Sequence, residues 1–531
     1  MKICLIRPPA LPRYHDIDIK EDPMLTAVLG YFESINLSDS NWDLFDFQLD
    51  KNITYKDLLK NEYAHYVVAA RDVGESYRYS VRIANLLSDD TTAGVWLYGQ
   101  VAPLRNRNDL KPRVIIVNQS ETELAAHLGI ETTGAHFAQD LRYKTYYPYI
   151  NMEDWQQSRR KGVLETTRGC PYKCKFCFIN VGQSYEKRWQ TRNNDMIMAD
   201  IKSYTDMGIN QLTFLDSEFL GRNKNHYKSR TILLQRIIDE LPPIKYMILC
   251  RADTLLEFDQ FNLFKQSGLN KVLVGVESLY QPDLDFLRKD TTVEKLKQSI
   301  IKLIEIEVEC CLTFLTFHRN TTIEGLRSNL SVVKDLYSHP KARYLGMPNF
   351  SFNMEVVRGE VVDEVPMEDL TNVTYLRPLL EARGQVESGK ACFPVNMEPL
   401  IEVFRILQYE WVVKKCELIR EKAILPQIDK DKINMWFNNL GMFCVDTMMH
   451  FVDIFEAGGL TFKTLKIQCE HLFDMYKEYH GILPVNLQFL ATYDHFAGLD
   501  YKKSVNMDDH GWDQIIPEKS ESNFCEVEYC G

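Results

Sequence analysis

The sequence contains no long hydrophobic run and no surplus of basic residues. No stretch approaches the roughly 18 apolar residues of a membrane-spanning helix. The short apolar run Ile3–Ile6 is followed at once by Arg7-Pro8-Pro9, too early for the apolar core of a signal peptide. With 62 Lys and Arg against 74 Asp and Glu, the net charge is −12, whereas general nucleic-acid binders carry a basic surplus. We therefore expect a cytoplasmic protein with neither a membrane nor a nucleic acid as partner.

Glycine and proline are also not enriched, with 25 and 20 residues in a chain of 531. This argues against long disordered or fibrous segments. Hydrophobic residues make up 45% of the chain, enough for two to four domains with sizeable cores. In a reducing cytoplasm the 13 cysteines are expected to be free thiols or metal ligands instead of a disulfide framework.

Residues 1–145 alternate between strand and helix patterns, which predicts a parallel, doubly wound, Rossmann-like sheet in an α/β protein. The expected strands are Lys2–Ile6, Asp43–Phe47, His65–Ala70, Val95–Tyr98 and Val114–Val117, and the expected helices are Pro23–Glu33, Tyr77–Leu87 and Glu121–Leu128.

Residues 146–345 repeat the alternation more regularly, and residues 346–531 lose the strand signals. Six strand–helix units predict a partial (β/α)6 barrel, with strands at Val163–Thr167, Gln211–Leu215, Tyr246–Cys250, Lys271–Val276, Cys311–Phe317 and Phe350–Val356. The clearest helix between them is Val293–Ile306, with one apolar stripe. The last part is expected to be a mainly helical substrate or capping domain with a polar tail, its helices at Leu400–Lys422, Lys432–Phe455 and Phe462–His480.

Three cysteines lie close together, Cys170, Cys174 and Cys177. Their spacing of four and three residues allows one small loop to bind a cubane iron–sulfur cluster, whose irons normally take four thiolates. With no fourth cysteine nearby, one iron would stay open to bind and activate a substrate. The alternative, a zinc site, needs a fourth ligand at short range, and the next histidine is His226. We therefore expect an iron–sulfur cluster.

The motif Cys170-xxx-Cys174-x-Phe176-Cys177 resembles the signature of the radical S-adenosylmethionine (radical SAM) superfamily, including the aromatic Phe176. The resemblance implies a [4Fe-4S] cluster whose open iron binds SAM, with Phe176 beside the cofactors. It implies a 5′-deoxyadenosyl radical that removes hydrogen from a peptide or small natural product. It further implies an electron donor such as flavodoxin or ferredoxin as partner.

Polar residues at the ends of successive predicted strands are the candidates to bind SAM. Asp216 and Glu218 follow the second strand, Arg251 ends the third, and Glu277-Ser278 ends the fourth in a turn that resembles the family's Gly-x-Glu-Ser. Each of them could instead form a structural ion pair. Phe317–Thr322 replaces the Gly-Pro-rich turn of relatives, so the adenine contacts stay open.

The first domain, with Arg7-Pro8-Pro9 after its first strand, also resembles the cobalamin-binding domain that precedes many radical SAM barrels. The lower-ligand motif Asp-x-His-x-x-Gly is missing, although radical SAM relatives often lack it. The fourth strand ends in Tyr98-Gly99-Gln100, where relatives carry two glycines, and the longer Gln100 would crowd the nucleotide tail. We therefore favour a scaffold without cobalamin and leave cobalamin binding open.

Three functions follow from these features. The preferred hypothesis is a peptidyl L-to-D epimerase without cobalamin, resembling those of the proteusin pathways. Its hydrogen donor would be Cys392, in the turn-like segment Gly389–Pro394, with Cys310, Cys311 or Cys416 in reserve. The alternative is a cobalamin-dependent radical SAM C-methyltransferase. The third, a non-catalytic binding protein, is disfavoured by the intact triple cysteine.

Overall fold

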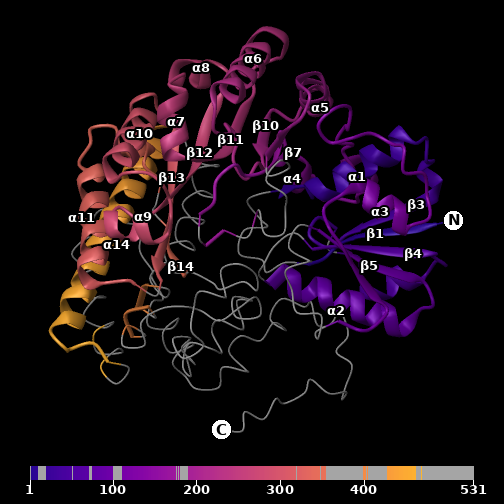
Figure 1. Cartoon of the computed structure of the whole chain (residues 1–531), viewed down its shortest axis with the longest axis horizontal. Helices are drawn as coiled ribbons and strands as arrows, with labels where there is room; N and C mark the ends of the chain where they lie inside the picture. The colour runs from indigo at the N-terminus through magenta and orange to yellow at the C-terminus, as the bar shows by residue number, and fades with distance from the viewer. Residues whose placement is uncertain are drawn as a thin grey trace.

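The computed structural model describes residues 2–9, 19–50, 52–70, 75–99, 110–174, 176–177, 179, 189–318, 320–346, 349–353, 397, 399–401, 403–404, 427–461, 464 and 468. Two parallel sheets organise these residues (Figure 1). The N-terminus lies on the outer side of the first domain, and the strands of that domain run inward toward the second (Figure 1). This orientation decides which sheet edges face each other.

The first sheet has five parallel strands in the order β3-β1-β4-β5-β6. They are β1 (Ile3–Arg7), β3 (Trp42–Asp46), β4 (His65–Ala69), β5 (Gly94–Tyr98) and β6 (Val114–Val117). Helices α1 (Pro23–Ser34) and α3 (Glu121–His127) cover one face and α2 (Glu75–Asp90) the other (Figure 1). The predicted doubly wound sheet is confirmed, and its strand order is the flavodoxin type. Such sheets bind ligands beyond their carboxyl ends, where the strand order reverses.

The second sheet curls into a partial barrel of parallel strands in the order β14-β13-β12-β11-β10-β7-β2. Six strands correspond to the six predicted ones, and the first of them, β7, begins and ends three residues earlier than predicted. They are β7 (Arg160–Leu164), β10 (Gln211–Phe214), β11 (Lys245–Arg251), β12 (Leu269–Glu277), β13 (Glu309–Phe317) and β14 (Asn349–Asn353). The seventh, β2 (Ile19–Lys20), follows the first strand of the first domain in sequence and pairs with β7. The sequence did not suggest it, because two residues carry no periodic pattern.

The predicted first barrel strand, Val163–Thr167, runs past the end of β7. The amide groups of Thr166 and Thr167 donate to the Asp216 carboxylate at 2.5 and 2.7 Å instead of to a neighbouring strand. Thr167 then begins a separate two-stranded antiparallel ribbon of β8 (Thr167–Gly169) and β9 (Trp189–Thr191). This ribbon leads directly into the cysteine loop.

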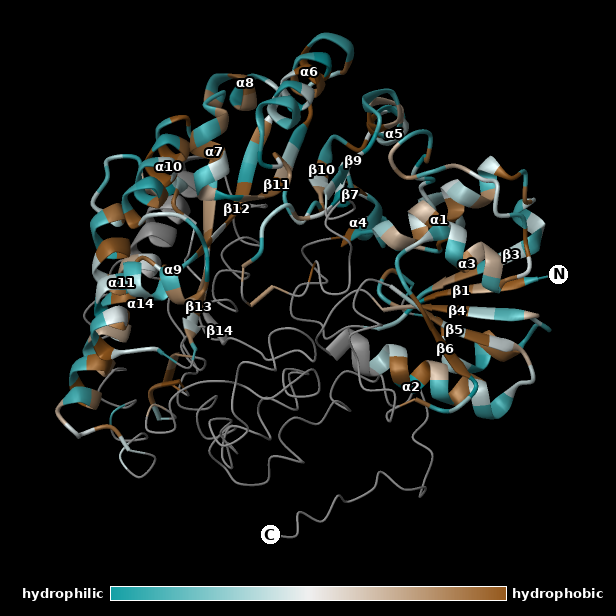
Figure 2. Ribbon diagram, in the orientation of Figure 1, coloured by the Kyte–Doolittle hydropathy of each residue, from teal (hydrophilic) through white to brown (hydrophobic). Residues whose placement is uncertain are grey.

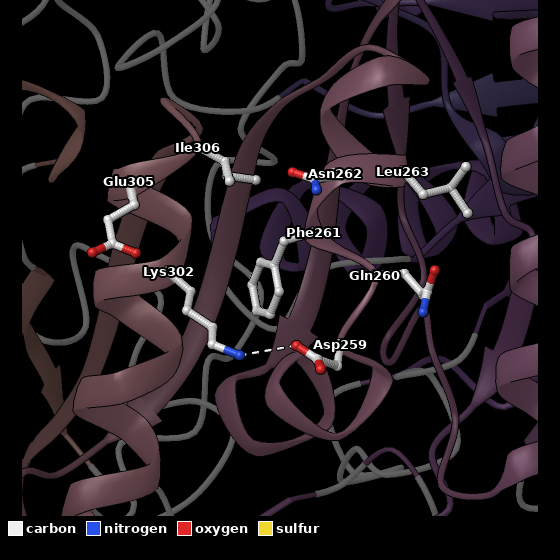
Figure 3. Close-up of a pocket in the computed structure, with 8 residues that line it drawn as sticks. All are labelled: Asp259, Gln260, Phe261, Asn262, Leu263, Lys302, Glu305 and Ile306. Atoms are coloured by element: carbon white, nitrogen blue, oxygen red, sulfur yellow. Dashed lines mark hydrogen bonds and ion pairs between the residues drawn. The ribbon is translucent and has the colours of Figure 1, made fainter.

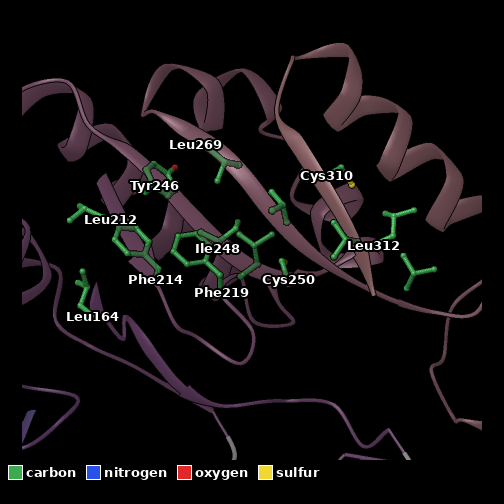
Figure 4. Packing of buried hydrophobic residues seen from close by; sticks show 14 of the residues in the cluster. Leu164, Leu212, Phe214, Phe219, Tyr246, Ile248, Cys250, Leu269, Cys310 and Leu312 are labelled. Atoms are coloured by element: carbon green, nitrogen blue, oxygen red, sulfur yellow. The ribbon is translucent and has the colours of Figure 1, made fainter. Parts of the chain in front are cut away.

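Helices cover the outside of the barrel (Figure 2), and hydrophobic side chains fill the space beneath them (Figure 4). The helices are α4 (Asp154–Gln157), α5 (Asn194–Asp206), α6 (Lys224–Glu240), α7 (Ala252–Phe258), α8 (Phe261–Gln266), α9 (Gln281–Phe286), α10 (Val293–Glu305) and α11 (Ile323–Tyr337). The predicted apolar stripe of α10 is buried throughout, as helical spacing requires, and consists of Leu296, Ile300, Leu303 and Ile304.

Helix α14 (Gln427–Glu456) matches the predicted helix Lys432–Phe455 and packs along α11. Ion pairs join the two helices, including Lys334 with Asp446 at 2.6 Å. Most of the predicted helices Phe462–His480 and Leu400–Lys422 lies outside the described residues. The domain boundaries at 145 and 345 stay predictions. Within the described part of the chain, no helix is long and apolar enough to cross a membrane.

Candidate active site

The cysteine loop begins at the end of the β8–β9 ribbon. Gly169 adopts a left-handed conformation, φ +78°, which glycine tolerates without strain, and so turns the chain into Cys170. The amide of Cys177 donates to the carbonyl of Cys174 at 3.2 Å, which closes the loop. All three thiols are partly exposed and none is in a disulfide. One short loop therefore presents the three predicted ligands together.

The three thiols do not converge on the position of a single ion. In the described part of the chain, no three His, Cys, Asp or Glu side chains converge so that they could hold one metal ion. A cubane does not require this convergence, because each thiolate binds a different iron. Burial raises the pKa of the Cys170 thiol, with the Glu218 charge adding to it, and burial raises the pKa of Cys177 to about 11. A bound cation such as iron would favour the ionised thiolates of Cys170 and Cys177.

Arg251 extends from the carboxyl end of β11 to the cysteine loop. Its Nη1 donates to the Sγ of Cys174 at 3.2 Å, and its guanidinium lies 4.0 Å from the ring centre of Tyr172. Asp253 holds the guanidinium through two hydrogen bonds of 2.9 and 2.7 Å. Arg251 thus touches the loop itself, and its neighbour Asp253 was not singled out from the sequence.

Glu277 stands at the carboxyl end of β12 in a left-handed conformation, φ +65°, which is uncommon for a residue with a side chain. Its carboxylate lies 2.8 Å from the Nζ of Lys289, and the Lys289 side chain is only 3% exposed. The same Nζ lies 5.9 Å from the ring centre of Phe176. A buried cation and a carboxylate therefore stand together beside the cysteine loop.

The other predicted strand-end residues make structural contacts around this centre. The buried Asp216 carboxylate accepts hydrogen bonds from the amides of Thr166 and Thr167, between β7 and the cysteine loop. Burial raises the pKa of Asp216 to about 6. Glu218 accepts hydrogen bonds from the Arg251 amide and the Cys250 thiol at 3.0 Å each, and burial raises its pKa to about 7. The Ser278 hydroxyl bonds to Asp283 at 2.9 Å. The structure places all three at the predicted edge, and their roles toward SAM stay predictions.

Lys289 is the main site residue that the sequence reasoning missed. It lies in the loop between α9 and α10, twelve residues after the end of β12, so strand-end position gave no signal. Both of its neighbours, Arg288 and Asp290, have positive φ values of 51° and 52°. This unusual backbone turns the Lys289 side chain into the barrel, and only the tertiary structure reveals it.

Of the candidate hydrogen-donor cysteines, Cys392 and Cys416 lie outside the described residues. The described candidates do not gather at this edge. Cys310 and Cys311 sit at the amino end of β13, about 20 Å of strand from its carboxyl end. Cys250 is at the correct edge, but its thiol is buried and bonded to Glu218. The described cysteines outside the loop therefore give the donor hypothesis no support.

The carboxyl edge of the first sheet meets the carboxyl edge of the barrel at this point. Gln119, just after β6, donates to both Glu165 oxygens at 3.2 and 3.0 Å. Arg168, two residues before the first cysteine, forms two hydrogen bonds of 2.9 and 2.6 Å with Glu121 at the start of α3. The Arg168 side chain also donates to Glu165 at 2.9 Å. The carboxyl edges of both sheets thus face the same region.

A cleft of about 310 Å³ lies elsewhere, on the helical outside of the barrel (Figure 3). Residues of α8, α10 and the turn before α8 line it, and Asp259 pairs with Lys302 across it at 2.9 Å. It contains none of the predicted site residues, so we do not assign the chemistry to it.

Residues 164–330 match the model of the radical SAM superfamily. This segment contains the cysteine loop, Arg251, Glu277 and Lys289, and it is a radical SAM domain. The match confirms the predicted [4Fe-4S] cluster and SAM as its cofactors.

Two curated relatives show the breadth of this similarity. An anaerobic magnesium-protoporphyrin IX monomethyl ester cyclase of Rubrivivax gelatinosus is 25% identical over 236 residues, 44% of this chain and 40% of the relative. An uncharacterized methyltransferase of Pyrococcus horikoshii is 23% identical over 176 residues, 33% of this chain and 37% of the relative. The chain thus spans about two fifths of the length of the curated relatives it matches.

Among solved structures, the cobalamin-dependent SAM radical enzyme OxsB with aqua-cobalamin and SAM bound superposes with a TM-score of 0.64. The alignment covers 98% of this chain and 82% of OxsB at 13% sequence identity. At this identity the likeness establishes the fold: a cobalamin-binding-like sheet followed by a radical SAM partial barrel.

Proposed function

We propose that this protein is a cobalamin-dependent radical SAM enzyme that transfers a methyl group to carbon in a peptide or small natural product. The observation that carries the proposal is the meeting of the two carboxyl edges through Gln119, Glu121, Glu165 and Arg168. A cofactor bound at the edge of the first sheet would lie across from the cysteine loop. An epimerase has no use for a second cofactor at that position.

The residues of the barrel have separable tasks in this proposal. The three loop cysteines hold the cluster, and Arg251 fixes one of them through its hydrogen bond to Cys174. The Glu277–Lys289 pair offers a carboxylate and a cation, which match the amino and carboxylate groups of SAM. When bound, cluster and SAM supply a 5′-deoxyadenosyl radical and cobalamin supplies the methyl group. The chain itself orients these groups and keeps water away.

The comparisons favour this function over the epimerase that the sequence suggested first. The two curated relatives are a cyclase and a methyltransferase, and OxsB is a cobalamin-dependent enzyme. The argument from Gln100 against cobalamin concerns a residue outside the described part of the chain. For Gly99 itself, an added Cβ would lie 2.3 Å from the Ala70 carbonyl oxygen, so this glycine is required by strand packing.

Cobalamin binding is the first test. Anaerobically purified full-length protein, titrated with hydroxocobalamin, is expected to bind about one equivalent, as one switch point per sheet implies. The variant with all three loop cysteines changed to alanine is the matched control. It should still bind cobalamin, because the two sites belong to different sheets. Protein that retains its cluster but takes up no cobalamin would contradict the proposal.

The product decides between methylation and epimerisation. Candidate peptides or natural products are incubated with the loaded enzyme, SAM and a reductant in deuterated water, and then analysed by mass spectrometry. Methyl transfer adds the mass of a methylene group, and the use of SAM with a deuterated methyl group moves that mass further. A gain of a single deuterium from solvent without methylation would restore the epimerase hypothesis.

A further inference from the structure

The guanidinium of Arg251 is held in one orientation at the carboxyl end of β11. Its Nε and Nη2 donate to the two carboxylate oxygens of Asp253 at 2.9 and 2.7 Å. Nη2 also donates to the backbone carbonyl of Lys289. The Arg251 side chain is 6% exposed, and the ring centre of Tyr172 lies 4.0 Å from its guanidinium carbon. Contacts from three segments of the chain thus fix this buried cation.

This orientation turns the other terminal nitrogen of Arg251 toward the cysteine loop. Asp253 binds the side of the guanidinium formed by Nε and Nη2, the bidentate geometry that suits a planar fork of donors and a carboxylate. Nη1 is then free to donate to the Sγ of Cys174 at 3.2 Å. Asp253 therefore positions Arg251 for its contact with a predicted cluster ligand.

Two carboxylates, Glu218 and Glu277, also lie near the cysteine loop and carry the opposite charge. Burial is the largest cause of the raised pKa of the other two loop thiols, and the charges of these carboxylates add to it. Glu277 is itself paired with Lys289 at 2.8 Å. Both carboxylates act on the loop through space, whereas Arg251 is in hydrogen-bond contact with the Cys174 sulfur. A change of charge at Arg251 should therefore be felt directly at this ligand.

We propose that Arg251 raises the reduction potential of the cluster through its hydrogen bond to Cys174, with Asp253 as the residue that positions it. On reduction the cluster takes up one electron and gains one unit of negative charge, and no bond forms or breaks. A cation in contact with a ligand sulfur stabilises this added charge, and hydrogen bonds to the sulfurs are among the factors that set cluster potentials. The proposal rests on the radical SAM domain alone, and it gives Arg251 a role other than the SAM contact predicted from the sequence.

The test is potentiometry of anaerobically reconstituted full-length protein in the absence of SAM, cobalamin and substrate. Dithionite supplies the electrons, electron paramagnetic resonance measures the reduced cluster at each potential, and iron analysis verifies equal loading. The wild type is compared with Arg251→Gln, Arg251→Lys and Asp253→Asn. The matched control is Lys271→Met, which also removes a cation from an ion pair of the barrel sheet, with Glu309 at 3.0 Å. Lys271 lies six residues before Glu277 on β12, roughly 20 Å along the strand.

Arg251→Gln should lower the equilibrium constant for cluster reduction at least about tenfold, which for one electron lowers the midpoint potential by about 59 mV. Arg251→Lys keeps the charge but not the fork of donors, so its potential should lie between those of Arg251→Gln and the wild type. Asp253→Asn removes a negative charge and should raise the potential. The opposite signs are decisive, because both changes break the same bidentate pair and a structural loosening of the loop would shift both potentials alike. Lys271→Met should match the wild type.

An unchanged potential in Arg251→Gln, or an equal shift in the Lys271→Met control, would overturn the proposal. So would shifts of the same sign in Arg251→Gln and Asp253→Asn. If Arg251→Gln holds no cluster, Asp253→Asn decides: a higher potential supports the proposal, and an unchanged or lower one refutes it. None of these measurements involves methyl transfer or cobalamin, so the failure of this proposal and the failure of the proposed function are separate results.

Discussion

The most direct test of how the two domains are joined is the removal of Arg168. Its side chain is 15% exposed, and that of Glu121 is 6% exposed. Burial by itself would raise the pKa of Glu121, but the Arg168 charge and hydrogen bonds outweigh burial, so the pKa is lowered. Arg168→Ala therefore leaves a buried carboxylate without its cation. We expect the free energy of unfolding to fall by about 3–5 kcal/mol, the usual cost of breaking a buried pair.

A double-mutant cycle with Glu121→Gln separates this interaction from the contact of the Arg168 guanidinium with the Phe137 ring. Urea unfolding of the full-length protein is measured for the wild type, both single variants and the double variant. The coupling should be at least about 1.5 kcal/mol, as for other close charge pairs. The matched control is Arg236→Ala, which removes the surface pairs with Asp195 and Glu240 and should cost less than about 1 kcal/mol for each pair. Equal costs for Arg168 and Arg236, or a coupling below about 0.5 kcal/mol, would refute the reasoning.

Three further predictions concern the site and its surroundings. Changing all three loop cysteines to alanine should remove both the bound iron, about four per chain, and the visible absorbance of the reconstituted protein, whereas a retained full cluster would place the site elsewhere. Glu277→Gln and Lys289→Met should each weaken SAM binding about ten- to a hundredfold in calorimetry with the iron content unchanged, since each removes one charged hydrogen bond. Burial raises the pKa of Glu21 to about 7. Folding therefore binds a proton between pH 4.5 and 7, and the free energy of unfolding decreases as the pH rises through that window. Glu21→Gln should abolish roughly 3 kcal/mol of this decrease, and an unchanged pH profile would contradict the prediction.

Much of the fold could be read from local patterns. The strands of the first domain were predicted to within one or two residues, because each is a short apolar run bounded by turns. The apolar stripe of α10 was predicted residue by residue, because helical spacing alone decides which side chains face the sheet. The early end of β7 was not predicted. It depends on the Asp216 carboxylate, which accepts hydrogen bonds from the two amides that follow the strand, and these groups are about 50 residues apart in sequence.

The reaction was harder to predict than the cofactor. The sequence suggested an epimerase with Cys392 as donor, whereas the matched relatives and the facing sheet edges support the methyltransferase alternative. A cysteine motif identifies a cluster because its three ligands lie within eight residues. Which reaction follows radical formation depends on the group that lies opposite the cluster. The packing of the two domains decides which group that is.

The sequence alone thus determined most strands of both sheets and the cofactors of the barrel, and it predicts the cluster ligands, because all of these follow from local spacing along the chain. Only the tertiary structure placed β2 in the barrel sheet, Lys289 beside Glu277, and Glu121 against Arg168. Each of these contacts depends on how distant strands and helices pack together. Such packing leaves no periodic pattern in the sequence of either segment, so the sequence alone could not predict it.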